Sequence, residues 1–443
     1  MVRTDRRSFL KHSAGAAAAL VVAPAVLPTA CAASDDAGDA AAADTPAEAA
    51  DVPATPDGVL ADAELDATDL SDVALAESEV VPDAPGTVHA VLGDSLTELY
   101  AMGREAARRV GIVPGALEGK TVFIKPNFVA KGMEMLGCGF DPNTGEVTKP
   151  ELVAAVAEQC LEAGAAKVTI GDGAQTKTWD WTTVPFVTGN TVEGTTNLGD
   201  AATRLQGLYG AERVALECLN EVNDWVPVPS TSTANNVKDG IFVARSFAEA
   251  DVVISLPVLK THQWAHLTAS MKCYVGVVSS APEHHGNNIS RCKLHLAYKD
   301  ATCYGVANAG VSGSFVDIHK WRVDTGHEDI AILDATIGLE GNGPHKKPVN
   351  DGHTIHLNAR NAAQKYFLLA GRDFTAVDAT AARIIACQPD DIVSLKMCRN
   401  AGLGLLDDVP LVGATLDDLK VSDWEQPVLR GEDYFTNVCP KDS

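Results

Sequence analysis

The chain has 443 residues, of which 59 are acidic and 35 are lysine or arginine, so its formal net charge is −24. This length suffices for one large α/β domain or for two joined lobes. An acidic chain with no basic stripe and no interleaved aromatic residues argues against nucleic acid as a partner.

The first 31 residues are typical of a twin-arginine signal peptide. The letters RRSFLK, which contain Arg6 and Arg7, precede an alanine-rich stretch at 14–27 that carries no charge. We therefore expect export by the twin-arginine translocase to a periplasmic or other extracytoplasmic location. Cys31 stands where a lipoprotein signal is cut and acylated, and lipidation there would tether the protein to a membrane surface. The alternative is simple cleavage near that position.

Residues 32–85 are predicted to form a disordered acidic tether rich in Ala, Asp and Pro. Fifteen acidic residues lie between Asp35 and Asp83, and no lysine or arginine occurs between Lys11 and Arg104. Such a segment repels itself and cannot bury a core. The folded α/β domain is therefore expected at residues 86–443.

Within this domain, short apolar runs alternate with segments of helical spacing. The predicted strands are Thr121–Lys125, Lys167–Gly171, Asp251–Leu256, Asp329–Asp334 and Tyr366–Gly371, and the predicted helices are Glu151–Ala163, Phe374–Ala386 and Ser394–Ala401. This alternation indicates an α/β fold, in which a largely parallel sheet carries helices on both faces.

The ten cysteines contain no Cys-x-x-Cys pair, and their closest spacing is eleven residues. This spacing excludes a local iron-sulfur motif and a zinc ribbon. The cofactor is otherwise undetermined, and a divalent metal is the candidate that the acidic residues below suggest. The sequence also lacks the glycine-rich phosphate loop and the Gly-x-Ser-x-Gly elbow.

Six ordered blocks carry a resemblance to a known family. They are Val122–Asn127, Ile170–Gly173, Val253–His262, Thr268–Lys272, Leu333–Pro344 and Phe374–Ala379. Together they resemble the family called domain of unknown function 362, which implies an α/β fold but no general activity. The chain departs from the family pattern at Cys273, where asparagine is usual, and it lacks the ferredoxin module of some members.

Polar residues follow directly on four of the apolar strands. Ligands of open parallel sheets bind beyond the carboxyl ends of the strands, so these residues are expected to converge on one crevice: Lys125, Asn127, Asp172, Lys260, His262 and Asp334. Lys272 would add positive charge for a carboxylate or phosphate ligand. The alternative is that each lysine merely solvates the end of a strand.

The metal hypothesis rests on acidic and histidine residues. Four carboxylates could hold a divalent cation, namely Asp172, Asp334, Glu340 and Asp378. His266 could also bind a metal if residues 261–271 were helical, because His262 and His266 would then share a face. Gly341 and Gly343 could offer backbone amides to an anion, or they could simply form a tight turn.

The functional hypothesis is an exported enzyme that acts on an anionic small molecule, with or without a divalent metal. Lys260 and His262 are the candidates for polarising the substrate and transferring a proton. The alternative is a tethered protein that binds a ligand or metal without turnover, and a surface scaffold is the third hypothesis.

Overall fold

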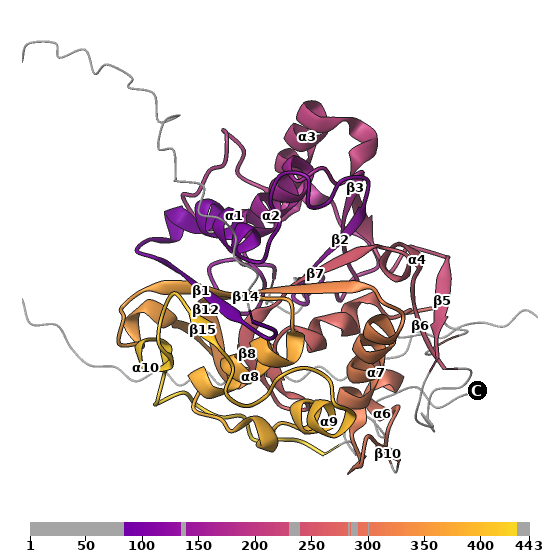
Figure 1. Ribbon diagram of the computed structural model, residues 1–443, viewed down its shortest axis with the longest axis vertical. Coiled ribbons are helices and arrows are strands. Elements are labelled where there is room, and N and C mark those ends of the chain that lie inside the picture. Colours follow the sequence, from indigo (N-terminus) through magenta and orange to yellow (C-terminus); the bar gives the residue numbers. More distant parts are fainter. Residues whose placement is uncertain are drawn as a thin grey trace, which may run out of the picture. The chain divides into compact units, whose positions relative to one another are not determined.

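A long twisted sheet organises the chain (Figure 1). The computed structural model describes residues 84–133, 139–229, 240–281, 284, 291–299 and 301–431. The predicted signal peptide, Cys31 and all but the last two residues of the predicted tether lie outside these described residues. No described helix is long and apolar enough to cross a membrane.

Eight strands form the main path of the sheet in the order β15-β1-β14-β12-β7-β2-β3-β4. Their bounds are β1 Val88–Gly93, β2 Thr121–Pro126, β3 Lys167–Asp172, β4 Val214–Cys218, β7 Val252–Leu256, β12 Glu328–Asn342, β14 Tyr366–Gly371 and β15 Leu411–Val412. The run β12-β7-β2-β3-β4 is parallel throughout, whereas β14 is antiparallel to both of its neighbours. The predicted largely parallel sheet is therefore confirmed.

Three further strands extend the sheet beside the long strand β12. β8 (Val258–His262) runs parallel to β12, β9 (His266–Thr268) pairs with β8 as a hairpin, and β13 (Asp351–His356) is antiparallel to β12. Two small ladders lie apart from this sheet: β5 (Trp225–Val228) with β6 (Ile241–Ala244), and β10 (Thr302–Cys303) with β11 (Val306–Ala307).

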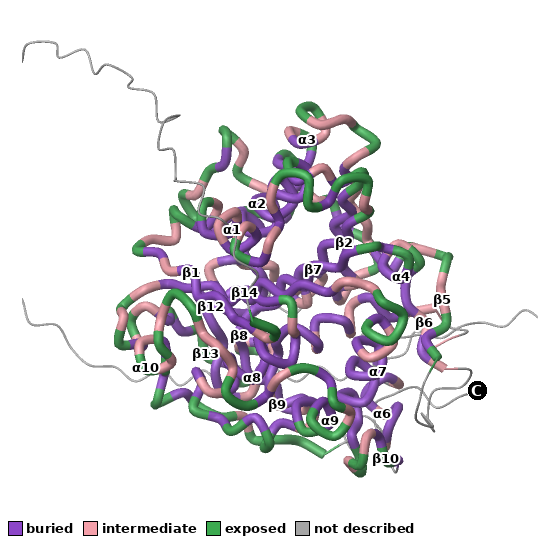
Figure 2. The backbone as a smooth tube through the Cα atoms, in the orientation of Figure 1, coloured by how far each residue is buried: buried purple, intermediate pink, exposed green. Residues whose placement is uncertain are grey.

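Helices cover both faces of the sheet. On one face lie α1 (Leu99–Arg109), α2 (Pro150–Glu162) and α3 (Leu198–Tyr209); on the other lie α7 (Gly310–Asp324), α8 (Phe374–Ile384) and α9 (Val393–Ala401) (Figure 1). The short helices are α4 (Arg245–Ala248), α6 (Cys292–Leu296) and α10 (Leu416–Leu419). Along β2, Val122 and Ile124 face the first group of helices and Phe123 faces the second, so the strand is buried on both sides (Figure 2).

Local signals set the ends of the helices. Pro150 starts α2, where its missing N–H costs nothing, and Gly164 follows the helix at a φ of 96°. Asp373 caps α8 by accepting a hydrogen bond from the amide of Ala376 at 3.0 Å.

Residues 261–271 are not helical, so this conditional helix prediction is wrong. The backbone of β8 pairs with β12, and His262 lies opposite His266 across the β8–β9 hairpin. The imidazole Nδ1 of His262 accepts the amides of Trp264 at 3.2 Å and Ala265 at 3.3 Å, which holds the tight turn between the strands.

Candidate functional site

Two parallel strands place a buried ion pair at the carboxyl edge of the sheet. Lys125 stands one residue before the end of β2, and Asp172 is the last residue of β3. Lys125 Nζ contacts Asp172 Oδ1 and also donates to the carbonyl of Pro126 at 2.5 Å. The other carboxylate oxygen of Asp172 accepts the amide of Phe128 at 2.7 Å. Both side chains are almost fully buried, at 1% and 4% exposure, so the pair forms the floor of the site.

A 3-10 helix, η6 (Met271–Val277), crosses this edge of the sheet. Asp378 on α8 anchors its start, because its carboxylate accepts the amides of Ser270 at 2.7 Å and Met271 at 3.3 Å. Through η6 the chain brings Lys272 and Cys273 to the ion pair, and Cys273 Sγ lies 3.8 Å from Lys125 Nζ.

A small pocket of about 60 Å³ lies between η6 and the ends of β2 and β3. Its lining residues are Lys125, Asn127, Val129, Asp172, Gly173, Gln175, Lys272, Cys273, Val275, Gly276 and Arg291. A water needs roughly 10–15 Å³ by this kind of measure, so the space holds several waters or one small polar group.

Two glycines keep this space open. A Cβ at Gly276 would lie 2.7 Å from Lys125 Nζ and would also collide with Asp172. A Cβ at Gly173 would collide with the Arg291 guanidinium. Side chains at either position would therefore displace the charged groups of the pocket.

The pocket carries more positive than negative charge. Three of its lining residues are cationic, namely Lys125, Lys272 and Arg291, and one, Asp172, is a carboxylate. Arg291 is buried and donates to Asn220 Oδ1 at 2.7 Å and to the carbonyl of Val278 at 3.0 Å. Burial lowers the pKa of Arg291 to about 10, which leaves it cationic at neutral pH.

Lys272 differs from the other two cations of the pocket. Within the part of the chain that the structure describes, no hydrogen-bond acceptor or carboxylate pairs with its ammonium group, which is half-buried. Desolvation lowers the pKa of Lys272 to about 8, and the neighbouring charge of Lys125 acts in the same direction.

Lys260 and His262 do not line this pocket. Lys260 donates to the carbonyl of Glu146 at 2.5 Å, and desolvation lowers its pKa to about 7. Burial holds the pKa of His262 well below its usual value, and its Nδ1 accepts two amides, so the ring is neutral with its proton on Nε2. The structure thus gives His262 a role in the hairpin turn.

Three of the residues considered for a metal site do not come together. Asp334 pairs with Lys149 at 3.2 Å, Glu340 pairs with Arg360 at 3.3 Å, and His266 Nε2 contacts Cys387 Sγ at 3.5 Å. Among the described residues, no three His, Cys, Asp or Glu side chains form a group that could hold a metal ion.

The two predicted anion-binding glycines serve chain packing. Gly341 has a φ of 76° and donates its amide to the carbonyl of Glu425 at 2.8 Å. At Gly343 a Cβ would collide with the carbonyl of Thr261 on β8. The positive φ therefore explains Gly341, and close contact between two backbones explains Gly343.

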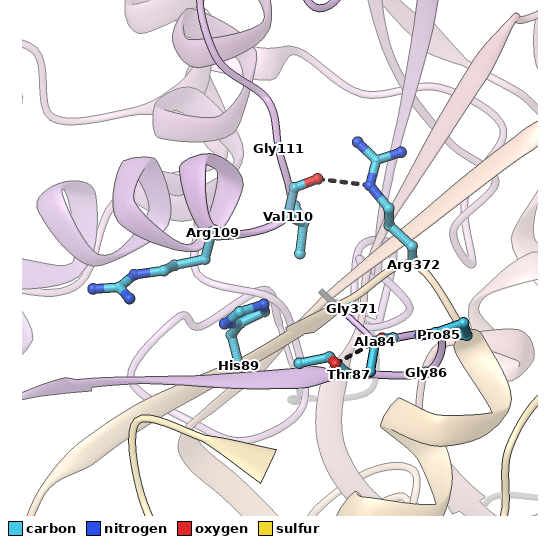
Figure 3. Close-up of a pocket in the computed structure, with 10 residues that line it drawn as sticks. All are labelled: Ala84, Pro85, Gly86, Thr87, His89, Arg109, Val110, Gly111, Gly371 and Arg372. Atoms are coloured by element: carbon cyan, nitrogen blue, oxygen red, sulfur yellow. Dashed lines mark hydrogen bonds between the residues drawn. The ribbon is translucent and has the colours of Figure 1, made fainter. Parts of the chain in front are cut away.

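A second hollow, of about 290 Å³, lies beside the start of β1 and the end of β14 (Figure 3). Arg372 donates through Nε to the carbonyl of Val110 at 2.7 Å and forms an ion pair with Glu328, and Arg109 pairs with Glu105 at 2.6 Å. The arginines of this hollow are thus already engaged, and we regard the η6 pocket as the candidate site.

Sequence reasoning identified four lining residues of the η6 pocket, which are Lys125, Asn127, Asp172 and Lys272. It missed Arg291, which lies outside every motif block, at a φ of 56°. For Cys273 the sequence indicates a departure from the family pattern and a place in a histidine-rich stretch, and neither predicts that it lines this pocket. Gly276 carried no signal, because a glycine that makes room for a side chain more than a hundred residues away leaves no local pattern.

The fold and the pocket define an α/β protein with a polar site at the carboxyl edge of a mostly parallel sheet. The family model described as Domain of unknown function (DUF362) matches residues 122–383, more than half of the chain, and the chain belongs to this family. All lining residues of the η6 pocket fall within the matched range.

Comparisons with individual proteins add little to this assignment. No curated protein matches the chain. One similar solved structure is that of a Thermotoga maritima protein from a structural genomics consortium, at 10% identity and a TM-score of 0.32. That match covers 66% of this chain and 60% of the other, so the chain spans less than two thirds of that protein.

Proposed function

We propose that this protein binds a small anionic molecule, with a carboxylate or phosphate group held in the η6 pocket. The observation that carries the proposal is the ammonium group of Lys272, which lines the pocket and has no partner among the described residues. Leaving a partly desolvated charge unpaired is costly, and an anion would supply the missing partner.

The other groups of the pocket fit the same ligand. Arg291 adds a second cation, and guanidinium groups suit planar carboxylates and phosphates. Asn127 offers a neutral amide at the wall. The volume of about 60 Å³ admits the anionic group and leaves a larger ligand to project outward.

Titration calorimetry of the full-length protein with inorganic phosphate and with lactate tests the proposal. Lys272→Met should weaken binding about 10- to 100-fold, because a hydrogen bond to a charged group contributes about 1.5–3 kcal/mol. Lys347→Met is the matched control, since Lys347 is 74% exposed and lies outside the pocket. Equal affinities in the two variants, or no binding of either anion at millimolar concentration, would contradict the proposal.

Turnover at this pocket is the second candidate function. It is favoured by the position of Lys260, a buried amine whose pKa of about 7, set by desolvation, allows proton exchange at neutral pH. Lys260 does not line the pocket, so it would act there through its electrostatic interaction with Lys272.

We further propose export by the twin-arginine pathway and lipidation of Cys31. The support is the RRSFLK motif and the position of the cysteine after the apolar stretch. Replacement of Arg6 and Arg7 by lysine should leave the precursor in the cytoplasm, and Cys31→Ser should release the exported protein from the membrane. Cell fractionation distinguishes these outcomes, and unchanged fractionation of a variant would refute the corresponding assignment.

A further inference from the structure

The amine of Lys272 is available for covalent chemistry, unlike the other cations of its pocket. Lys125 is held by Asp172 and by the carbonyl of Pro126. Arg291 is held by Asn220 and by the carbonyl of Val278. Lys272 faces the same space without such a partner in the described part of the chain. Among these three groups it is therefore the one that can approach a ligand without first breaking an ion pair or hydrogen bond.

The surroundings of Lys272 raise the fraction of neutral amine, which is the nucleophilic form, although the ammonium remains the major form at neutral pH. Lysines are activated in this way by desolvation or by neighbouring positive charge. Burial lowers the pKa of Lys272 to about 8, so a much larger fraction of this amine is neutral near neutral pH than of an exposed lysine, whose pKa is about 10.4.

Cys273 is the competing nucleophile in the pocket, and its setting keeps it protonated. Its thiol lies 3.4 Å from the carbonyl oxygen of Lys125 and 3.5 Å from that of Pro126, both of which accept the S–H hydrogen. Burial raises the pKa of Cys273. A thiol must lose its proton to attack, so the amine is the group prepared for reaction.

We propose that Lys272 forms an imine with the carbonyl group of a small 2-oxo acid bound in the η6 pocket. The inference rests on the proposed anion site, because the carboxylate of this substrate would lie against the cationic lining of that pocket, to which Lys125 and Arg291 contribute. A 2-oxo acid places its carbonyl carbon next to the carboxylate, which suits a pocket of about 60 Å³ in which the anion and the reacting carbon must share one small space.

The reaction is balanced without any further reagent. Lys272 Nζ forms a bond to the carbonyl carbon while the C=O π electrons move to oxygen and give a carbinolamine. The oxygen takes up protons and leaves as water, and the nitrogen lone pair forms the C=N bond. Overall, the ammonium form and the ketone yield a protonated imine and one water.

Reductive trapping tests this proposal. The full-length protein is incubated with pyruvate and sodium cyanoborohydride, and the modified residues are located by peptide mass mapping. We expect the adduct on Lys272 at least about tenfold above that on exposed Lys347, in line with the larger neutral fraction of the buried amine. Lactate, which has no carbonyl group, should protect Lys272 and leave Lys347 unaffected.

The Lys272→Arg variant distinguishes imine formation from anion binding. Arginine keeps the positive charge, so this variant should still bind lactate in the calorimeter but should form no adduct at position 272. If lactate binds to the unaltered protein and Lys272 is modified no more than Lys347, the imine proposal is wrong and the anion site stands. If neither lactate nor pyruvate binds, both proposals are wrong.

Discussion

The buried pair of Lys149 and Asp334 makes a specific prediction about stability. Asp334 Oδ2 accepts Lys149 Nζ at 3.2 Å and the Lys149 amide at 3.1 Å, and Asp334 Oδ1 accepts the hydroxyl of Thr336 at 2.6 Å. Both charged side chains are fully buried. Asp334→Asn retains the size of the side chain but leaves the Lys149 ammonium without its counter-charge.

Breaking a buried pair on one side costs about 3–5 kcal/mol, because the remaining charge stays desolvated. With a urea m-value of about 3 kcal/mol/M, the unfolding midpoint of Asp334→Asn should fall by about 1–1.7 M. The assay is urea unfolding followed by circular dichroism. Lys149→Met combined with Asp334→Asn should recover part of this loss, since no uncompensated charge remains. A midpoint shift below about 0.3 M in the single variant would refute the structural role of Asp334.

Three further predictions concern the η6 pocket. Anion affinity should fall as the pH rises through about 8, because Lys272 then loses the charge that the anion stabilises. Calorimetry between about pH 7 and 9.5 measures this trend, and Lys272→Arg should remove it. An affinity that rises with pH would contradict the prediction. Gly276→Ala should weaken phosphate binding about tenfold or more, because the added Cβ displaces the Lys125–Asp172 pair. The control is Gly207→Ala, where a Cβ meets nothing within 4 Å, and it should leave binding unchanged. Equal affinities in the two variants would show that phosphate binding does not need a glycine at position 276. Asp378→Asn removes one acceptor for the two amides that start η6. The variant should therefore be less stable by about 1–3 kcal/mol in urea unfolding and should bind phosphate more weakly. Unchanged phosphate binding would show that the position of η6 does not determine the anion site.

Protonation of Lys272 also affects folding, with a sign opposite to its effect on binding. Its pKa is lower in the folded protein than in the unfolded chain because of burial, so the unfolded chain binds more protons between about pH 8 and 10.5. The contribution of Lys272 to the free energy of unfolding therefore rises with pH across this window, while anion affinity falls. The two opposing trends distinguish loss of the ligand from loss of the fold.

Much of the fold follows from short-range patterns. The apolar runs at Thr121–Lys125, Lys167–Gly171 and Tyr366–Gly371 are strands in the structure with ends within one residue of the prediction. Central parallel strands are apolar on both faces, which makes such runs conspicuous. The predicted strand at Asp329–Asp334 is correct but continues to Asn342, because β13 and β8 supply pairing partners beyond the apolar run.

The site was predictable only where it depends on the ends of the strands. Lys125 and Asp172 meet because neighbouring parallel strands end at the same edge, as the topology requires. Lys260 belongs to β8, a strand that follows β7 after a single residue, and it donates to the carbonyl of Glu146 and does not line the pocket. Cys273 reaches the pocket through η6, whose start is held by the long-range contact of Ser270 with Asp378, and Arg291 lines the pocket from a part of the chain outside every motif block.

The most direct test of the central claim is a crystal structure of the full-length protein soaked with selenate, whose selenium can be located by anomalous scattering. The anion site predicts a peak in the η6 pocket, with selenate oxygens about 3 Å from Lys272 Nζ and from the Arg291 guanidinium. The peak should disappear in Lys272→Met and persist in Lys347→Met. Selenate bound only elsewhere, for example beside Arg372 in the hollow of Figure 3, would contradict the account.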